Sequence, residues 1–382
     1  MNITFLLGNG FDIQCGLKTS YLDFYKHILR KKYSIEMNED NVDIDEKLIS
    51  KIDNIIYQEI YKFKDDIQTW ADLEYQLGIF SIQLKRKGYG TKLANRLLDD
   101  FDILQIDLNN YLKEIQIQDD VKIDEDFSEV LFKTMDEFFN GVTDVQYDEI
   151  KKTLVENRDS NFVYRFISFN YTNSLQKILE NCGHIKKSNI FNGVDLEQMI
   201  YNSVENVHGV IGKDLLLGLN DESQVATDFF EKNDLTELLK PETLANSGDY
   251  RRKNAEDFID SSDLIVIFGM SIGSTDKHWW EKIADILLKN KNKKLIIHFY
   301  VKKQDGYISQ RMKNESRKKN EEKFIFKLDN LKLSEEQDLQ LRKQIYIVTN
   351  SQYIMNVDLS KYLNQDKNKS NNIIDFEAKD IV

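Results

Sequence analysis

The sequence predicts an α/β protein in which a mostly parallel β-sheet is flanked by helices, with a large all-helical insertion after the first strand–helix unit. Three observations predict this class. The apolar run Ile3–Leu7 ends at Gly8-Asn9-Gly10 and precedes a helical pattern, the order of elements that opens many doubly wound α/β sheets. Asp263–Phe268 is apolar almost throughout, as in a strand covered on both faces. Between these two runs, apolar residues spaced by three and four indicate long helices.

The expected elements are these, in chain order. After the first strand, Tyr21–Arg30 has a helical pattern, with Thr19 or Ser20 as its N-terminal cap. A second strand is expected at Phe162–Phe169, followed by a helix through Leu179. The later strands are expected at Ser203–Val207, Leu215–Leu217, Asp263–Phe268, Lys294–Val301 and Gln344–Thr349.

The segment 40–156 has a different pattern. Leu97, Phe101, Leu104 and Leu108 step by three and four residues, so they line one helical face. We therefore predict a discontinuous sheet domain over 1–36 and 157–362, a helical insertion over 40–156 and a polar tail over 363–382. Arg311–Lys319, between the last two strands, is a basic helical stretch, which is typical of a solvated helix face.

Composition restricts the function. The 52 Lys and Arg against 65 Asp and Glu give a formal net charge of −13, and an acidic surface disfavours nucleic acid and anionic membranes as partners. Two cysteines, Cys15 and Cys182, provide neither a disulfide framework nor a zinc cluster. The apolar start is too short for a signal peptide, and no run approaches the roughly 18 apolar residues of a membrane span. We expect a reduced, cytoplasmic protein.

Four loops that come after predicted strands carry the candidate site, because ligands of open α/β sheets bind beyond the carboxyl ends of the strands. The first is Gly8-Asn9-Gly10-Phe11-Asp12, where glycines allow a phosphate to approach the backbone and a helix N-terminus offers N–H donors. A plain tight turn explains the two glycines equally well. In the second loop, Asn170-Tyr171, the amide of Asn170 can hold a water or a ribose hydroxyl, or simply form a turn.

The third loop is His208-Gly209. A histidine titrates near neutral pH and suits general acid/base catalysis, although a buried core histidine is the common alternative. The fourth loop runs from Gly269 through Ser271 to Asp276, and its hydroxyls suit a ribose or a phosphate, whereas Asp276 can also cap the next helix. We expect the four loops to converge on one cleft at Gly8, Asn170, His208 and Gly269.

One acidic pair lies in the helical region, at Trp70-Ala71-Asp72-Leu73-Glu74. Carboxylates in the first turn of a helix stabilise its dipole, and this explains Asp72 and Glu74 without a ligand. A metal site would need further ligands, to which the sequence does not point.

Taken together, these stretches resemble the AbiH family of bacterial phage abortive-infection proteins. The similarity runs through Leu7–Asp12, Gly16–Tyr21, Trp70–Glu74, Phe169–Thr172, Val207–Gly209 and Gly269–Asp276. It is weakest in the rest of the helical insertion and toward the C-terminus. The family in turn resembles sirtuin-like domains, which implies a Rossmann-like fold around NAD.

That resemblance implies a role for each loop. The glycine loop Gly8–Asp12, with Asn9, Gly10 and Phe11, falls where sirtuin-like domains hold the dinucleotide. Asn170 and Tyr171 fall near the nicotinamide ribose, and His208 falls on the histidine that activates a hydroxyl or a water. The loop with Gly269, Ser271 and Asp276 falls on the adenosine side. This chain departs from the pattern in lacking the four zinc cysteines and in having Thr172 in place of an acidic residue.

The expected function is that of an anti-phage effector that hydrolyses the nicotinamide–ribose bond of NAD, with no zinc or other metal. Asn170 would orient the water and His208 would act as the base. Two alternatives remain: a metal-dependent nuclease or phosphohydrolase using Asp12, Asp72, Glu74 and Asp276, and a non-catalytic sensor or adaptor. The expected partners are NAD or a related nucleotide, a phage trigger or operon partner protein, and a second copy of the chain.

Overall fold

The computed structural model describes residues 1–37, 46–62, 73–88, 90–118, 120–121, 123, 125–191, 194–219, 221–247, 250–300, 309–349 and 354–363. At its centre is a seven-stranded sheet with the order β3-β4-β2-β1-β5-β6-β7. The strands are β1 (Asn2–Leu7), β2 (Phe162–Ser168), β3 (Ile185–Phe191), β4 (Val194–Asn206), β5 (Leu264–Phe268), β6 (Lys294–Phe299) and β7 (Ile345–Thr349). All neighbouring strands pair in parallel except β3, which is antiparallel to β4 at one edge.

The helices of the described residues flank this sheet and extend beyond it. They are α1 (Asn9–Gln14), α2 (Tyr21–Tyr33), α3 (Glu46–Ile49), α4 (Ile55–Lys62), α6 (Leu73–Arg86), α7 (Thr91–Ile115), α8 (Ser128–Glu137), α9 (Asp144–Glu156), α10 (Ser174–Glu180), α11 (Lys232–Leu238), α12 (Lys240–Ser247), α13 (Arg251–Ser261), α14 (Lys277–Lys289), α15 (Gln310–Phe326) and α16 (Glu335–Arg342). Local sequence fixes the start of α2. Ser20, not Thr19, caps α2 by accepting a hydrogen bond from the Asp23 N–H at 3.0 Å.

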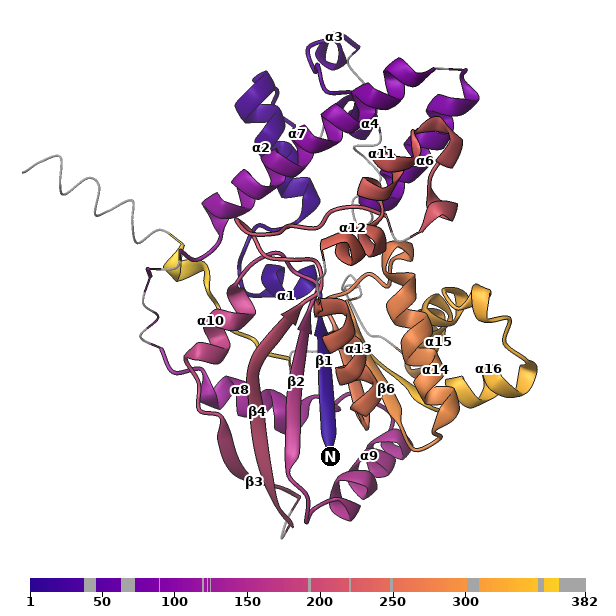
Figure 1. Cartoon of the computed structure of the whole chain (residues 1–382). Helices are drawn as coiled ribbons and strands as arrows, with labels where there is room; N and C mark the ends of the chain where they lie inside the picture. Colours follow the sequence, from indigo (N-terminus) through magenta and orange to yellow (C-terminus); the bar gives the residue numbers. More distant parts are fainter. Residues whose placement is uncertain are drawn as a thin grey trace, which may run out of the picture.

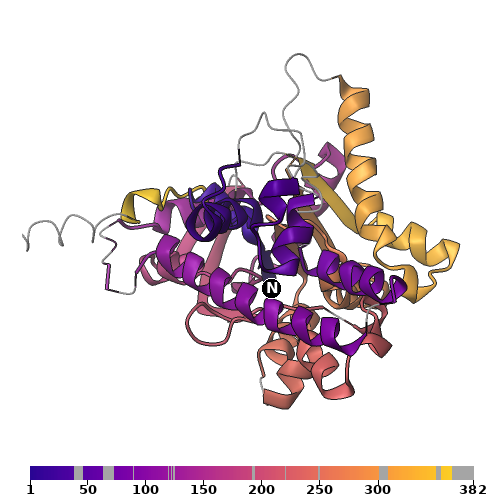
Figure 2. The ribbon, with the colours of Figure 1, turned by 90° about the horizontal axis from the view of Figure 1, so that it is seen from above.

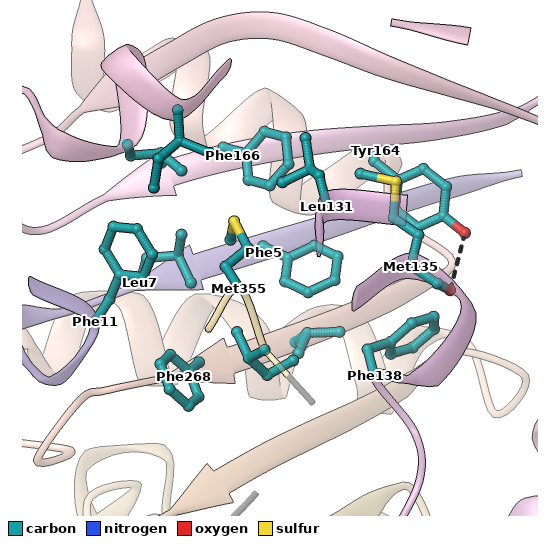
Figure 3. Close-up of a cluster of buried hydrophobic side chains, with 14 of the residues drawn as sticks. Phe5, Leu7, Phe11, Leu131, Met135, Phe138, Tyr164, Phe166, Phe268 and Met355 are labelled. Atoms are coloured by element: carbon teal, nitrogen blue, oxygen red, sulfur yellow. Dashed lines mark hydrogen bonds between the residues drawn. The ribbon is translucent and has the colours of Figure 1, made fainter. Parts of the chain in front are cut away.

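The two faces of the sheet bury alternate residues of each strand, as the pleat requires. On one face, Phe5 and Leu7 of β1 pack with Leu131 and Met135 of α8, and Phe5 meets the ring of Phe138 edge-on at 5.8 Å (Figure 3). The opposite face contributes Leu6, Ile167, Ile265 and Ile297 to a second cluster formed with α13, α14, α15 and α16. The central sheet is therefore buried on both sides, which confirms the prediction from the apolar run at β5.

A third apolar cluster lies beyond the carboxyl ends of the strands. It joins α2, α4, α6 and α7 to the segment 211–239, and we call this group the helical layer. In Figure 1 the arrowhead of β1 points toward it, and Figure 2 shows α7 lying across the molecule when seen from above. The predicted stripe of α7 faces this cluster, since Leu97, Phe101, Leu104 and Leu108 are all buried.

The sequence-based prediction of a mostly parallel sheet flanked by helices is confirmed. Between β1 and β2, the described residues contain helices and no strand. These helices contribute to two different apolar clusters: α8 and α9 pack on the sheet, whereas α2 to α7 belong to the helical layer. The boundaries of the predicted domains stay a prediction. Within the described residues, no helix has both the length and the apolar character needed to cross a membrane.

Several boundaries differ from the predictions. Leu215–Leu217 is not a strand, because Leu217 fills the core of the helical layer instead of pairing with the sheet. Ser203–Val207 covers only the end of β4, and the sequence did not predict the edge strand β3. Val301, Trp70–Asp72 and residues 364–382 of the predicted tail lie outside the described residues. The basic stretch lies on α15, where the exposed Arg311 pairs with Glu315, in agreement with a solvated face.

Candidate functional site

A cleft of about 390 Å³ lies between the carboxyl ends of the strands and the helical layer. Its lining residues are Gly8, Asn9, Gly10, Asp12, Ile13, Thr19, Ser20, Tyr21, Leu22, Leu73, Glu74, Leu108, Leu112, Phe169, Asn170, Tyr171, Thr172, His208, Gly269, Met270, Ser271, Thr275 and Asp276. The four predicted loops thus meet at one place, with all of their candidate residues except Phe11. Phe11 is fully buried instead, in the apolar core on one face of the sheet.

The glycines of the first and fourth loops are required by a close backbone approach. Gly10 donates its N–H to the carbonyl of Gly269 at 2.8 Å, and a Cβ on Gly10 would lie 2.7 Å from the Cα of Gly269. Gly269 itself has φ +71, where side chains other than glycine are strained. These residues therefore bring the ends of β1 and β5 together, so the tight-turn explanation accounts for them.

Asn9 connects the glycine loop to the loop before α2 through hydrogen bonds with Thr19. Its side-chain amide donates to the carbonyl of Thr19 at 3.0 Å and accepts from the Thr19 hydroxyl at 2.5 Å. Both polar ends of the Asn9 side chain are thereby used inside the protein. These hydrogen bonds hold the start of α2 against the cleft, and Ser20 and Tyr21 line the cleft there.

Asp12 is the most buried carboxyl group of the cleft, with 1% of its surface exposed. The hydroxyl of Thr172 donates to Asp12 Oδ2 at 2.6 Å, whereas Asp12 Oδ1 has no hydrogen-bond partner among the described residues. Burial raises the pKa of Asp12 to about 6, and hydrogen bonds with Thr172, Ser174 and Asn170 act in the opposite direction. Thr172 thus supplies a donor where an acidic residue would place a second carboxylate against Asp12.

Asn170 lies beside this carboxylate at the end of β2. Its backbone N–H donates to the Ser168 hydroxyl at 3.1 Å, which fixes the turn after the strand. Its side-chain oxygen is buried and has no partner among the described residues. The floor of the cleft therefore presents two unpartnered acceptor oxygens, Asp12 Oδ1 and Asn170 Oδ1.

His208 comes after β4 and forms the opposite wall. Its Nε2 lies 3.0 Å from Asp276 Oδ1, and the ring of Phe169 stands edge-on to it at 5.2 Å. The chain turns sharply here, because Gly209 has φ +81 and a Cβ would lie 1.8 Å from the carbonyl oxygen of Asp214. The ring is buried and has a partner, yet it still borders the cleft.

Asp276 does not cap the helix that begins after it. It occupies the N-cap position of α14, but its side chain makes no capping hydrogen bond and binds His208 instead. Burial alone would raise the pKa of Asp276, but the charges of His208 and Lys240 outweigh burial and hold it below its ordinary value. The capping alternative is therefore wrong for this residue.

Two further residues support His208: Lys240, which the sequence does not assign to any site, and Glu74, which the sequence places only in the metal-dependent alternative. Lys240 Nζ lies 3.4 Å from His208 Nε2 and 2.7 Å from Glu74 Oε2. Both partners of the Lys240–Glu74 ion pair are about 7% exposed, and Glu74 also accepts the N–H of Gly218 at 3.1 Å. Glu74 lies in the first turn of α6, as the helix-dipole explanation requires, and it is in addition the buried partner of a lysine. The one available signal was the position of Lys240, between two leucines and the single proline of the chain.

The loop after β5 carries backbone strain next to the cleft. Ile272 is buried and has φ +55, a conformation that β-branched residues rarely adopt. Packing of α14 holds the loop in place, since the Trp280 ring N–H donates to the carbonyl of Gly273 at 2.8 Å. Ser271 is exposed on this loop and lines the cleft.

The described carboxylates of the cleft do not form a metal-binding site. Within the described ranges, no group of three or more His, Cys, Asp or Glu side chains is arranged to hold a metal ion. Of the four acids in the metal-dependent alternative, Glu74 is bound by Lys240 and Asp276 by His208, while Asp72 lies outside the described residues. No specific observation therefore favours that alternative.

The comparisons with known proteins identify one family. The family model described as "Bacteriophage abortive infection AbiH" matches residues 4–299, which span β1 to β6 and include every residue of the cleft. A search of the curated proteins finds no match to the chain.

Proposed function

The chain belongs to the AbiH family of bacteriophage abortive-infection proteins, and we propose that it acts in phage defence by hydrolysing the nicotinamide–ribose bond of NAD. The proposed catalytic residues are Asn170 and His208. The observation that carries the proposal is their convergence with Asp12 and Asp276 on one cleft, although the four residues come from four separate loops.

The sheet provides the first support. Its parallel strands β1, β2, β4, β5, β6 and β7, numbered along the chain, lie in the order 3-2-1-4-5-6. Rossmann-like sheets have this order and bind dinucleotides where it reverses. In this chain the reversal falls beside β1 and β5, whose loops contribute Gly8 and Gly269 to the cleft. A nucleotide is therefore the ligand that the scaffold supports best.

The chemistry of the cleft suits cleavage of an N-glycosidic bond. In the proposed reaction the bond between C1′ and the pyridinium nitrogen breaks, and nicotinamide leaves with the electron pair as a neutral molecule. Water adds to C1′ and loses one proton, giving ADP-ribose. The sugar becomes positively charged in the transition state, and carboxylates in a water-poor site stabilise such charge. Asp276 and the ionised form of Asp12 would serve this purpose.

The proposed roles are based on the contacts. Asp276 holds the ring of His208 in one orientation, as a carboxylate does for a general base. His208 would accept the proton of the attacking water, and Asn170 would orient that water through its unpartnered amide oxygen. Neither role requires a metal.

The test is incubation of the full chain with NAD and quantification of free nicotinamide. We expect His208→Ala to lower the rate by about 10²–10⁴, the usual contribution of a general acid or base, and Asn170→Ala to lower the rate as well; the melting temperature of each variant shows that the chain assayed is folded. The matched control is His184→Ala, because His184 is exposed and lies before β3, outside the cleft.

Three results would contradict the proposal. The first is absence of nicotinamide release from NAD. The second is a His208→Ala variant that melts early but cleaves at the wild-type rate, which would make His208 a core residue. The third is activity that disappears with EDTA, which would favour the metal-dependent alternative. A nucleotide that co-purifies and is never turned over would support the sensor instead.

A further inference from the structure

The side chains lining the cleft that are charged or titrate near neutral pH are mostly carboxyl groups, with the imidazole of His208 beside them. The described lining residues include the carboxyl groups of Asp12, Glu74 and Asp276, and they include no lysine or arginine. Lys240, which does not line the cleft, is bound by Glu74 at 2.7 Å and lies 3.4 Å from His208 Nε2. Phosphate sites are normally built from Arg, Lys and free backbone N–H groups. A phosphate in this cleft would instead face carboxylates.

Three backbone donors of the glycine loop are already occupied. The N–H of Gly8 donates to the carbonyl of Phe268 at 3.0 Å, and the N–H of Gly10 donates to the carbonyl of Gly269 at 2.8 Å. The N–H of Phe11 donates to Gly8 within the same turn at 2.9 Å. The turn that would hold a pyrophosphate in a dinucleotide site therefore has these three donors bound inside the protein.

The unpartnered polar atoms on the cleft floor are acceptors. Asp12 Oδ1 and Asn170 Oδ1 are both buried, and each lacks a donor among the described residues. A buried acceptor without a partner costs free energy, which a ligand carrying donors recovers when it binds. The hydroxyls of a ribose are such donors, and a positive charge on the ligand would be attracted to the carboxylate.

From these three observations we infer that the cleft recognises a phosphate-free N-ribosyl group that carries positive charge, and that it excludes phosphate. This inference rests on the proposed function and narrows its substrate class. The nicotinamide-riboside end of NAD would enter the cleft, with its ribose hydroxyls at Asp12 and Asn170. The 5′-phosphate, which NAD and the 5′-monophosphate carry on the same ribose oxygen, would lie at the edge of the carboxylate-lined part and be repelled there, and the rest of NAD would remain outside. The volume of about 390 Å³ agrees with this, since it is near the lower end of the range for small-molecule sites.

The test compares nicotinamide riboside, its 5′-monophosphate and NAD at pH 8, where Asp12 is ionised because its pKa is about 6. Two quantities are measured for the full chain: kcat/KM for nicotinamide release, and the melting-temperature increase at equal ligand concentrations. We expect the riboside to exceed the monophosphate in kcat/KM by about 10-fold or more, because two like charges a few ångströms apart in the reduced dielectric of a protein site repel each other by that much. The riboside should also give the larger melting-temperature increase.

Two variants test which side chain causes the preference for the riboside over the monophosphate. Asp12→Asn should bring the ratio between riboside and monophosphate toward one, because it removes the charge and retains a polar side chain of the same shape. Asp285→Asn is the control, since it makes the same change of net charge on the exposed face of α14 and should leave the ratio unchanged. Added salt should reduce the wild-type ratio by screening the repulsion.

The outcomes separate this inference from the proposed function. Equal or better cleavage of the monophosphate would overturn the inference while the proposed function stands. If none of the three compounds releases nicotinamide, the proposed function fails, and the melting-temperature comparison still decides the inference. A larger increase with the riboside would then sustain it. A larger increase with the monophosphate, or none with either ligand, would overturn it.

Discussion

Two carboxyl groups in the same cleft have pKa values displaced in opposite directions. Asp12 is surrounded by hydroxyl and amide groups, and burial raises its pKa to about 6. Asp276 is also enclosed, but the charges of His208 and Lys240 more than offset burial and lower its pKa. Titratable groups separated in this way commonly have different roles in one reaction. At neutral pH, Asp276 is the firmly ionised member of the pair, and Asp12 is the one whose charge responds to pH.

The pKa of Asp12 predicts how stability changes with pH. Because the folded chain holds this proton more tightly than the unfolded chain, whose value is 3.8, ionisation lowers stability as pH rises from about 4 to about 6. Asp12→Asn removes the effect. Urea unfolding at intervals from pH 4 to pH 7 should show the variant gaining about 2 kcal/mol relative to wild type. Asp285→Asn should show no such trend, and parallel curves for Asp12→Asn and wild type would refute the raised pKa.

The site residues that lie directly after a strand are predictable from the sequence, and those that reach the site from elsewhere are not. Asn170, His208 and Asp276 were predictable because each comes after an apolar run that a parallel sheet brings to one edge. Lys240 was not, since its place depends on packing between the helical layer and the sheet. Phe11 belongs to the glycine loop in sequence, but α1 begins at Asn9 and turns that side chain into the core.

At the scale of elements, one buried ion pair joins α6 to the start of α12. Glu74 and Lys240 are 166 residues apart in the chain, and their side chains meet at 2.7 Å. Each helix brings one ionised side chain out of water to form this pair. Such a pair is costly to break, because removal of one partner leaves the other charge buried without compensation.

Lys240→Met should therefore lower the free energy of unfolding by about 3–5 kcal/mol, as measured by urea denaturation. Adding Glu74→Met to the same chain should restore most of this loss, because no unpaired charge then remains. Lys289→Met, which breaks an exposed pair within α14, is the control and should leave stability unchanged within error. A single variant as stable as wild type would mean that water reaches Glu74.

The elements that sequence reasoning found are those with strong local patterns. The strands β1, β2, β5, β6 and β7 are apolar runs bounded by turns, and α7 has a stripe that a period of 3.6 residues reveals. The edge strand β3 contains Lys186, Lys187, Ser188 and Asn189, so no alternating apolar pattern marks it. Leu215–Leu217 has a strand-like composition, but Leu217 packs in the helical layer, a tertiary choice that local pattern cannot reveal.

At the scale of the whole molecule, three apolar clusters hold the sheet between two helical faces and join it to the helical layer. Helices of similar amphipathic pattern suggest one insertion, yet α8 packs on the sheet and α7 packs above it. Periodicity shows that a helix has a buried side, and it does not show which core that side faces. This division places the cleft between the sheet and the helical layer.

Acid stability of the whole molecule depends on a second buried group, His298 on β6. It is 3% exposed beside the ring of Phe268, and burial lowers its pKa to about 4. The unfolded chain takes up this proton near pH 6.5 and the folded chain only near pH 4, so stability falls as pH decreases through that interval. This trend opposes that of Asp12.

His298→Leu tests this prediction, because a leucine suits the same apolar surroundings and cannot titrate. As pH falls from 7.5 to 5, the free energy of unfolding of the variant should rise by about 2 kcal/mol relative to wild type, the value given by pKa values of 6.5 and about 4. His184→Leu serves as the control, because His184 is exposed and its replacement should leave the pH dependence of stability unchanged. If the His298→Leu and wild-type curves stay parallel, folded His298 titrates as it does in the unfolded chain. Acid sensitivity would then have to arise from other groups.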